Sequence, residues 1–304
     1  MIEVNTETAN FAAVDLGSNA IRFMVKTATH QPNGQISSSV LMNMRVPIRL
    51  GEDVFLKGKI SSKKVQQLVQ MMKSVRHLLK VCNVQSFRAC GTSALREAEN
   101  AKKVQKAVEK GCGLKIEVIS GREEARMLFA NRQIENRKAL HMYVDVGGGS
   151  TEISLIKDGM VIESKSFRIG TVRMLLNATD KNVLEDIRAE VSELNKRYQD
   201  VVLIGSGGNI EKYYSLSDQK DKNKKTFPVA SLRKLYDTLS PLSIEERMEQ
   251  FNLKRDRADV IVPAGEIFLN IAECMETKDI KVPMYGLSDG IIADQIRQYW
   301  YEKK

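Results

Sequence analysis

The sequence is poor in the residues that build disulfide frameworks and zinc sites. Of its 304 residues only four are cysteine and only three are histidine. No two cysteines form a Cys-x-x-Cys pair, and the histidines show no metal-ligand spacing. We therefore expect reduced, mostly buried thiols, which are typical of a cytoplasmic protein.

Long apolar runs and aromatic clusters are also missing. No apolar stretch approaches the roughly 20 residues that a membrane-spanning helix needs, so we expect no membrane partner. Aromatic residues make up 6% of the chain, and no cluster of them accompanies the lysines. Because proteins that bind single-stranded nucleic acid stack bases on aromatic side chains, we also expect no nucleic-acid partner.

One common phosphate-binding motif does not occur. The absence of Gly-x-x-x-x-Gly-Lys-Ser/Thr excludes a P-loop NTPase. The formal net charge of +9 favours a polyanionic partner, although taken alone it fits an ordinary basic surface equally well.

The chain does contain two copies of one glycine-rich motif, beginning at Ala12 and at Met142. In each copy an apolar strand ends in an aspartate, a glycine-rich turn follows, and a second apolar strand leaves the turn. Because glycine has no Cβ, the N–H groups of such a turn can approach phosphate oxygens closely. Tight hairpins also use glycines, but two matched Asp-x-Gly turns favour a pair of phosphate cradles.

Patterns elsewhere alternate between strand and helix. Ser61 or Ser62 is expected to cap a helix that reaches Leu79, Asp158-Gly159 to form a hairpin turn, and residues 182–198 to form a helix. This alternation, with the internal duplication, predicts an α/β fold of two related lobes with mixed sheets flanked by helices and a cleft between them. We place the first lobe at residues 1–128 and the second at 129–289, with the border near 125–140.

Seven segments, in a fixed order, carry a resemblance to a known family. They are residues 15–19 (DLGSN), 91–96 (GTSALR), 120–126 (SGREEAR), 145–152 (DVGGGSTE), 205–208 (GSGG), 257–262 (RADVIV) and 286–290 (GLSDG). The set resembles the short, two-domain form of the exopolyphosphatase and guanosine pentaphosphate phosphohydrolase (Ppx/GppA) family, over nearly the whole chain. That family is part of the actin-like ATPase superfamily. The resemblance implies two actin-like, ribonuclease H-like lobes, an active site in the cleft, and a last helix, about 290–304, that returns to the first lobe.

Four carboxylates are the candidate catalytic and metal-binding groups. From spacing alone, Glu124 is an ordinary helix-start carboxylate beside the capping-box residue Glu123. The resemblance reverses this interpretation, because Glu124 matches the glutamate that carries the family's proposed catalytic base, and Glu152 matches a second carboxylate of the same cleft. Asp15 and Asp145, at the mouths of the two turns, are expected to orient Mg²⁺, with Mn²⁺ as the alternative.

The remaining candidate residues bind phosphate or nucleotide. The predicted phosphate-binding set is Gly17, Ser18, Asn19, Arg22, Arg96, Gly147, Gly148, Gly149, Ser150 and Thr151. Without the resemblance, Arg96 fits a surface arginine as well as a bidentate phosphate ligand. A nucleotide-binding turn is expected at Gly205, Ser206, Gly207 and Gly208, where the alternative is a strand-to-helix turn that needs close packing.

We therefore predict a phosphohydrolase that acts on phosphoanhydride bonds. It would release terminal orthophosphate from inorganic polyphosphate, guanosine pentaphosphate or both, by metal-assisted water attack, as a cytoplasmic homodimer. Two alternatives stay open. One is a non-catalytic or weakly catalytic sensor of guanosine tetra- or pentaphosphate, against which the intact Glu124 and Glu152 count. The other is an ATP-dependent kinase of the same superfamily, for which we find no sugar or acetate motif.

Overall fold

The computed structural model describes residues 6–130 and 139–302. Of the lobe border predicted near 125–140, residues 131–138 lie outside the described part. The chain divides into two compact units, one formed by Met1–Asn131 together with Leu287–Lys304 and the other by Arg132–Gly286. Within the described residues, none of the helices combines the length and apolarity needed to cross a bilayer.

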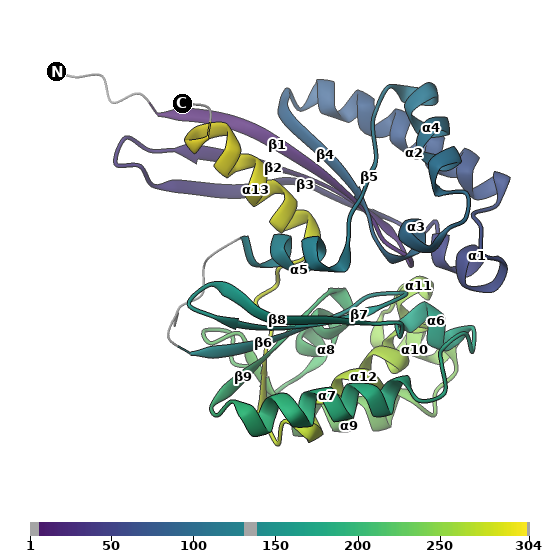
Figure 1. The fold of residues 1–304 in the computed structure, drawn as a ribbon, viewed down its shortest axis with the longest axis vertical. Coiled ribbons are helices and arrows are strands. Elements are labelled where there is room, and N and C mark those ends of the chain that lie inside the picture. Colours follow the sequence, from purple (N-terminus) through teal and green to yellow (C-terminus); the bar gives the residue numbers. More distant parts are fainter. Residues whose placement is uncertain (1–5, 131–138, 303–304) are drawn as a thin grey trace. The chain divides into compact units, whose positions relative to one another are not determined.

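The first unit is built on a mixed sheet in the order β3-β2-β1-β4-β5 (Figure 1). Strands β1, β2 and β3 pair antiparallel, whereas β4 lies parallel to β1 and β5 parallel to β4. The strands are β1 (Glu7–Leu16), β2 (Ile21–His30), β3 (Ile36–Val46), β4 (Val84–Gly91) and β5 (Glu117–Val118). The helices are α1 (Leu50–Lys57), α2 (Ser62–Val81), α3 (Ser93–Glu97), α4 (Ala101–Cys112), α5 (Gly121–Ala130) and α13 (Leu287–Tyr301).

Alternation along β1 buries side chains on both faces of this sheet. Phe11 and Ala13 belong to a cluster that includes residues of α5 and α13, while Val14 and Leu16 belong to a second cluster with residues of α1, α2 and α4. Successive strand residues point to opposite faces, so one strand contributes to both cores. Figure 1 shows the yellow helix α13 lying across β1 and β2, with which it is in contact.

Helix α13 is held in the first unit by specific contacts as well as by apolar packing. Asp289 forms an ion pair of 2.6 Å with Lys26 on β2, and both side chains are largely buried. At Gly290 an added Cβ would overlap the backbone carbonyl of Met127, so only glycine allows α13 to approach α5 this closely. The GLSDG segment at 286–290 therefore has a structural role at the junction of these two helices.

The second unit repeats the arrangement of the first. Its sheet runs β10-β11-β9-β6-β7-β8, so the antiparallel set β8-β7-β6 followed by parallel β9 matches β3-β2-β1 followed by β4. The strands are β6 (Leu140–Val146), β7 (Thr151–Lys157), β8 (Met160–Phe167), β9 (Val201–Ser206), β10 (Thr226–Pro228) and β11 (Asp279–Lys281). The helices are α6 (Thr171–Leu175), α7 (Val183–Arg197), α8 (Gly208–Leu216), α9 (Val229–Leu239), α10 (Ile244–Phe251), α11 (Arg255–Ala258) and α12 (Ile261–Cys274).

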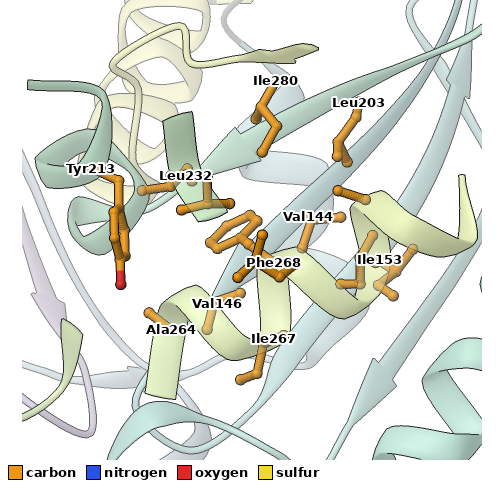
Figure 2. Close-up of a cluster of buried hydrophobic side chains, with 14 of the residues drawn as sticks. Val144, Val146, Ile153, Leu203, Tyr213, Leu232, Ala264, Ile267, Phe268 and Ile280 are labelled. Atoms are coloured by element: carbon orange, nitrogen blue, oxygen red, sulfur yellow. The ribbon is translucent and has the colours of Figure 1, made fainter. Parts of the chain in front are cut away.

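One large apolar core holds the second sheet to its helices. Figure 2 shows Phe268 and Ile267 of α12 among Val144, Val146 and Ile153, all of them buried. The side chain of Phe268 also lies against Gly205 on β9, where an added Cβ would come within 3.2 Å of its ring. The absence of a side chain at this position thus lets α12 pack closely on the strand that leads into the Gly-Ser-Gly-Gly turn.

Local expectations from the sequence hold in the described part. Helix α2 begins at Ser62 with Ser61 as its N-cap, and the Ser61 hydroxyl accepts a hydrogen bond from the N–H of Lys64 at 3.4 Å. Asp158 and Gly159 have φ values of 52° and 76°, as a tight two-residue hairpin requires. The helix expected at 182–198 is α7, which begins after Asn182.

Candidate functional site

The two predicted metal-binding aspartates occupy equivalent positions in their sheets. Asp15 on β1 pairs with Arg22 on β2 and with Cys90 on β4. Asp145 on β6 pairs with Glu152 on β7 and with Ser206 on β9. Each carboxylate therefore lies near the end of a central strand, immediately before a glycine-rich turn, as the duplicated sequence predicts.

Burial distinguishes the carboxylate of Asp15 from an ordinary aspartate. Loss of hydration raises its pKa from 3.8 to about 6, and the neighbouring Arg22 guanidinium only partly opposes this by lowering the pKa. Burial disfavours the ionised form of an acid unless a cation is supplied. Asp15 is therefore a group that would gain from a bound cation.

Hydrogen bonds from Arg49 and from the start of α1 hold the first turn in place. The backbone N–H of Gly51 donates to the carbonyl of Ser18 at 2.9 Å, and Nε of Arg49 donates to Oδ1 of Asn19 at 3.0 Å. Because that oxygen accepts the arginine proton, the amide nitrogen of Asn19 lies on the opposite side of the side chain. Asn19 can thus donate from its nitrogen, as expected of a phosphate-binding residue.

Ser18 adds a second donor to the first turn. Its hydroxyl oxygen is buried and has no hydrogen-bond partner among the residues that the structure describes. A buried hydroxyl normally has a partner, and one without it calls for an explanation such as an absent ligand. A phosphoryl oxygen would supply the missing acceptor.

In the second turn, successive carbonyl groups point toward the start of α6. The N–H of Thr171 donates to the carbonyl of Gly147 at 3.0 Å, and that of Val172 donates to Gly148 at 2.9 Å. Nε of Arg173 donates to the carbonyl of Gly149 at 2.9 Å. A trans peptide directs its C=O and N–H to opposite sides. The N–H groups of residues 148–150 therefore point away from α6, in the arrangement that forms an anion-binding nest.

The hydroxyl groups of the second turn are directed elsewhere. Ser150 donates to Oε1 of Glu152 at 2.6 Å, and Ser166 donates to the same oxygen at 2.9 Å. The hydroxyl of Thr151 donates to the carbonyl of Ile169 at 2.8 Å. Ser150 therefore contributes its backbone N–H to the nest, whereas the hydroxyl groups of Ser150 and Ser166 fix the orientation of the Glu152 side chain.

Glu123 and Glu124 follow each other in α5 but have different surroundings. The Ser120 N–H donates to Oε2 of Glu123 at 3.0 Å and the Glu123 N–H donates to the Ser120 hydroxyl at 3.2 Å, which is the capping box expected from the sequence. Hydrogen bonds that the N–H and the hydroxyl of Ser120 donate to the carboxylate lower the pKa of Glu123. Glu124 is instead buried, and its Oε2 accepts from Nη1 of Arg96 at 3.4 Å.

The position of Arg96 gives it a second role besides the predicted phosphate contact. The same nitrogen that faces Glu124 donates to the carbonyl of Ile119 at 2.8 Å. Arg96 thereby links α3 to the segment that begins α5, and it orients the Glu124 carboxylate. This contact with Arg96 gives Glu124 different surroundings from those of Glu123. The spacing of the two residues in the sequence does not reveal this difference.

The Gly-Ser-Gly-Gly turn of the second unit contacts Asp145 directly. Gly207 has a φ of 92°, and an added Cβ there would lie 2.8 Å from Oδ1 of Asp145. The Ser206 hydroxyl donates to the carbonyl of Tyr285 at 3.1 Å. Close packing explains why residue 205 is glycine, and the approach of Asp145 explains why residue 207 is glycine. The close-packing alternative therefore explains part of this turn. Its predicted nucleotide binding stays a prediction.

The carboxylates beside the two turns suit a cation whose coordination is completed largely by water and a bound phosphate. No three His, Cys, Asp or Glu side chains come together as a metal cluster within residues 6–130 and 139–302. Mg²⁺ is usually bound through one or two carboxylates, with water and substrate phosphates completing its coordination. Asp15 in the first unit and Asp145 in the second each lie beside a turn with N–H or hydroxyl donors, so each is by itself a candidate ligand of this kind.

Two features of the site are not visible in the sequence motifs. Gly170 packs against the second turn so closely that an added Cβ would lie 2.5 Å from the nitrogen of Gly149. Arg173, three residues later, is almost fully buried. The local sequence Gly170-Thr171-Val172-Arg173 shows no periodicity that would have pointed to the turn.

Two named relatives resemble this chain over most of its length. A protein described as guanosine-5'-triphosphate,3'-diphosphate pyrophosphatase from Vibrio parahaemolyticus is 25% identical over 311 residues, which cover 95% of this chain and 60% of that protein. This chain thus spans about three fifths of the Vibrio relative. A putative exopolyphosphatase of Haemophilus influenzae is 23% identical, over 92% of this chain and 90% of that protein.

Solved structures share the fold. A Ppx/GppA family member from Aquifex aeolicus matches with a TM-score of 0.76 and 25% identity, covering 97% of this chain and 100% of that one. An exopolyphosphatase from Cytophaga hutchinsonii matches with a TM-score of 0.81 at 20% identity, over 94% and 97% of the two chains. The predicted actin-like α/β class is confirmed by these likenesses. A family model described as the Ppx/GppA phosphatase family matches residues 29–299, and the chain therefore belongs to that family.

Proposed function

We propose that this protein is a phosphohydrolase that releases terminal orthophosphate from inorganic polyphosphate, guanosine pentaphosphate or both. The observation that carries the proposal is the second turn, whose three N–H groups face away from α6 beside Asp145. Such a nest binds oxyanions, and the names of the Vibrio and Haemophilus relatives supply the substrate class. A homodimer and a cytoplasmic location stay predictions.

Glu124 is the proposed general base. Its carboxylate would accept a proton from the attacking water, whose oxygen bonds to the terminal phosphorus while the phosphoanhydride bond breaks and the shortened chain leaves. The contact with Arg96 orients the carboxylate that receives this proton. Glu152, held by Ser150 and Ser166, is proposed to position water or ligand rather than to move a proton.

Asp15 and Asp145 are the carboxylates proposed to hold a divalent cation, Mg²⁺ or Mn²⁺. When bound, the cation neutralises charge that develops on the phosphoryl oxygens. The N–H groups of residues 148–150 and the donors of Ser18 and Asn19 bind the phosphoryl oxygens and orient them. Arg22, paired with Asp15, supplies a positive charge beside the first turn.

Orthophosphate release is the direct test of this function. Polyphosphate, guanosine pentaphosphate and ATP are each incubated with the protein and Mg²⁺, with EDTA as the control. We expect release from at least one of the first two and none with EDTA. Tight binding of guanosine nucleotides without release would identify a sensor, and consumption of ATP that depends on an added phosphate acceptor would identify a kinase.

Gly207→Ala should strongly impair this activity. The new Cβ would displace the Asp145 carboxylate, which lies 2.8 Å from its position, and a shift of about 1 Å in a catalytic group can cost about 100-fold in rate. We therefore expect a loss of that order in kcat/KM and a higher Mg²⁺ requirement, measured by phosphate release across a Mg²⁺ titration.

Gly159→Ala is the matched control for Gly207→Ala. Gly159 also has a positive φ, 76°, but an added Cβ there would meet nothing within 4 Å. Alanine at that position should cost only backbone strain, about 1 kcal/mol of unfolding free energy, with normal turnover. Equal turnover of the two variants would refute the proposed link between Gly207 and Asp145.

A further inference from the structure

We propose that Arg173 is a positioning residue that sets the direction of the Ser150 N–H group in the second turn. Arg173 lies in α6 and is 4% exposed. Its Nε donates to the carbonyl of Gly149 at 2.9 Å. The inference rests on the proposed function only for the identity of the ligand, a phosphate chain.

A single peptide joins the carbonyl of Gly149 to the N–H of Ser150. A trans peptide is planar, and its C=O and N–H point in opposite directions. Fixing the carbonyl of Gly149 on the guanidinium therefore fixes the N–H of Ser150 on the other side. Rotation of this peptide would break the hydrogen bond to Arg173 and turn the N–H away from the nest.

The two preceding peptides of the turn are held differently. The Gly147 carbonyl accepts from the N–H of Thr171, and the Gly148 carbonyl accepts from the N–H groups of Val172 and Arg173. These are backbone bonds, which any residue except proline can supply. Within the described residues, the carbonyl of Gly149 is the one of these three that accepts from a side chain. The third donor of the nest thus depends on the identity of residue 173.

The same hydrogen bonds show that α6 itself does not bind the anion. The N–H groups of Thr171, Val172 and Arg173, which begin the helix, are directed to carbonyl groups of the turn. The anion would therefore contact the turn, and α6 would hold the opposite side of the turn through these hydrogen bonds. The close approach of Gly170 to Gly148 and Gly149 makes this arrangement possible.

An arginine suits this position better than another donor. The Nε–H is part of a planar, rigid guanidinium, so its direction is fixed once the group is packed. An arginine side chain also carries a positive charge, and a cation behind the turn favours an anion in front of it. Lysine would retain the charge but replace the fixed donor with a flexible ammonium group.

Two substitutions separate direction from charge. Arg173→Gln removes the charge and the fixed Nε–H, whereas Arg173→Lys keeps the charge. Arg188→Gln is the matched control, because Nε of Arg188 also donates to an oxygen, Oδ1 of Asn270 at 2.7 Å, while its side chain is 52% exposed and remote in sequence from the turn. Binding of inorganic tripolyphosphate is measured by calorimetry in EDTA, beside the melting temperature of each protein.

We expect Arg173→Gln to weaken tripolyphosphate binding by about tenfold or more, the scale of one lost hydrogen bond to a charged ligand. Arg173→Lys should give a smaller loss, and Arg188→Gln none. In turnover assays the Arg173 variants should raise KM more than they lower kcat. Each protein is measured well below its own melting temperature, so that a loss of stability alone does not change the binding constant.

Unchanged tripolyphosphate affinity in folded Arg173→Gln and Arg173→Lys would overturn the proposal. Failure of both variants to fold would assign Arg173 to the core and would overturn it as well. Because binding is measured without hydrolysis, a wild type that binds tripolyphosphate but releases no phosphate would refute the proposed function and leave this inference standing. A wild type that does not bind tripolyphosphate in EDTA would overturn this inference, whereas the proposed function is tested separately by phosphate release with Mg²⁺.

Discussion

Glu124→Gln should lower kcat for phosphate release by at least about 100-fold, the usual scale for loss of a positioned general base. The glutamine is isosteric and can still accept the hydrogen bond from Nη1 of Arg96, so the orientation of the side chain should be retained. An amide does not accept a proton from water at neutral pH. KM and the melting temperature should therefore change little, which circular dichroism and steady-state kinetics will show.

Glu123→Gln provides a control that makes the same chemical change one residue earlier. Glu123 is exposed, and its role is to accept hydrogen bonds from Ser120 at the start of α5. Glutamine also serves in a capping box, so turnover should stay near that of the wild type, with only a small loss of stability because the lost charge lies on an exposed side chain. Normal turnover of Glu124→Gln, or an equal loss in Glu123→Gln, would show that Glu124 is not the base.

Asp15→Asn should lower the catalytic activity but raise the stability of the metal-free protein. The variant should lose most Mg²⁺-dependent turnover, because a neutral amide is a poor ligand for a hard cation. In EDTA it should be more stable than the wild type at pH 7.5. Burial raises the pKa of Asp15 to about 6, so ionised Asp15 costs the metal-free protein up to about 3 kcal/mol, at about 1.4 kcal/mol for each pKa unit.

The sign of the pH dependence follows from this pKa. Because the folded-state pKa of Asp15 lies above the unfolded value of 3.8, its contribution to stability is fully present below about pH 4 and is lost as the pH rises through about 6. Metal-free wild type should therefore lose stability, relative to Asp15→Asn, between pH 4 and 6. Thermal melts in EDTA across this range measure the difference directly.

Asp53→Asn gives the contrasting case in the same unit. Burial acts to raise the pKa of Asp53, but hydrogen bonds from Ser61 and the charge of Lys64 outweigh it, so the pKa is lowered. Neutralising Asp53 should therefore reduce stability at neutral pH, whereas neutralising Asp15 increases it. If Asp15→Asn were also destabilising in EDTA, the unfavourable burial of its charge would be refuted.

The parts of the fold that sequence reasoning predicts are those that depend on local pattern. The two Asp-x-Gly turns, the capping box at Ser120 and the hairpin at Asp158 are each specified within a few residues, and the structure has all of them. The repeated strand order follows from the same duplication. Short-range signals of this kind do not depend on how distant segments pack.

The features that escaped prediction involve residues far apart in the sequence. The contact between Arg173 and Gly149 joins a turn to a five-residue helix, which is too short to show a helical period. Gly207 has its role because β9 lies parallel to β6, next to Asp145. Sequence spacing could not separate Glu124 from Glu123 either, because the distinction comes from Arg96 on another helix.

Because α13 belongs to the first unit, that unit can complete its core only after the second unit has been translated. Residues 132–286 form a continuous unit, whereas the first unit requires Leu287–Lys304 as well. When a ribosome has made the chain up to Gly286, one face of β1 still lacks Ile291 and Ile292, which bury Phe11 and Ala13 in the finished protein. The unit whose strands are translated first therefore closes its core only after α13 has been made, and α5, which carries Glu124, then gains the helix that packs against it.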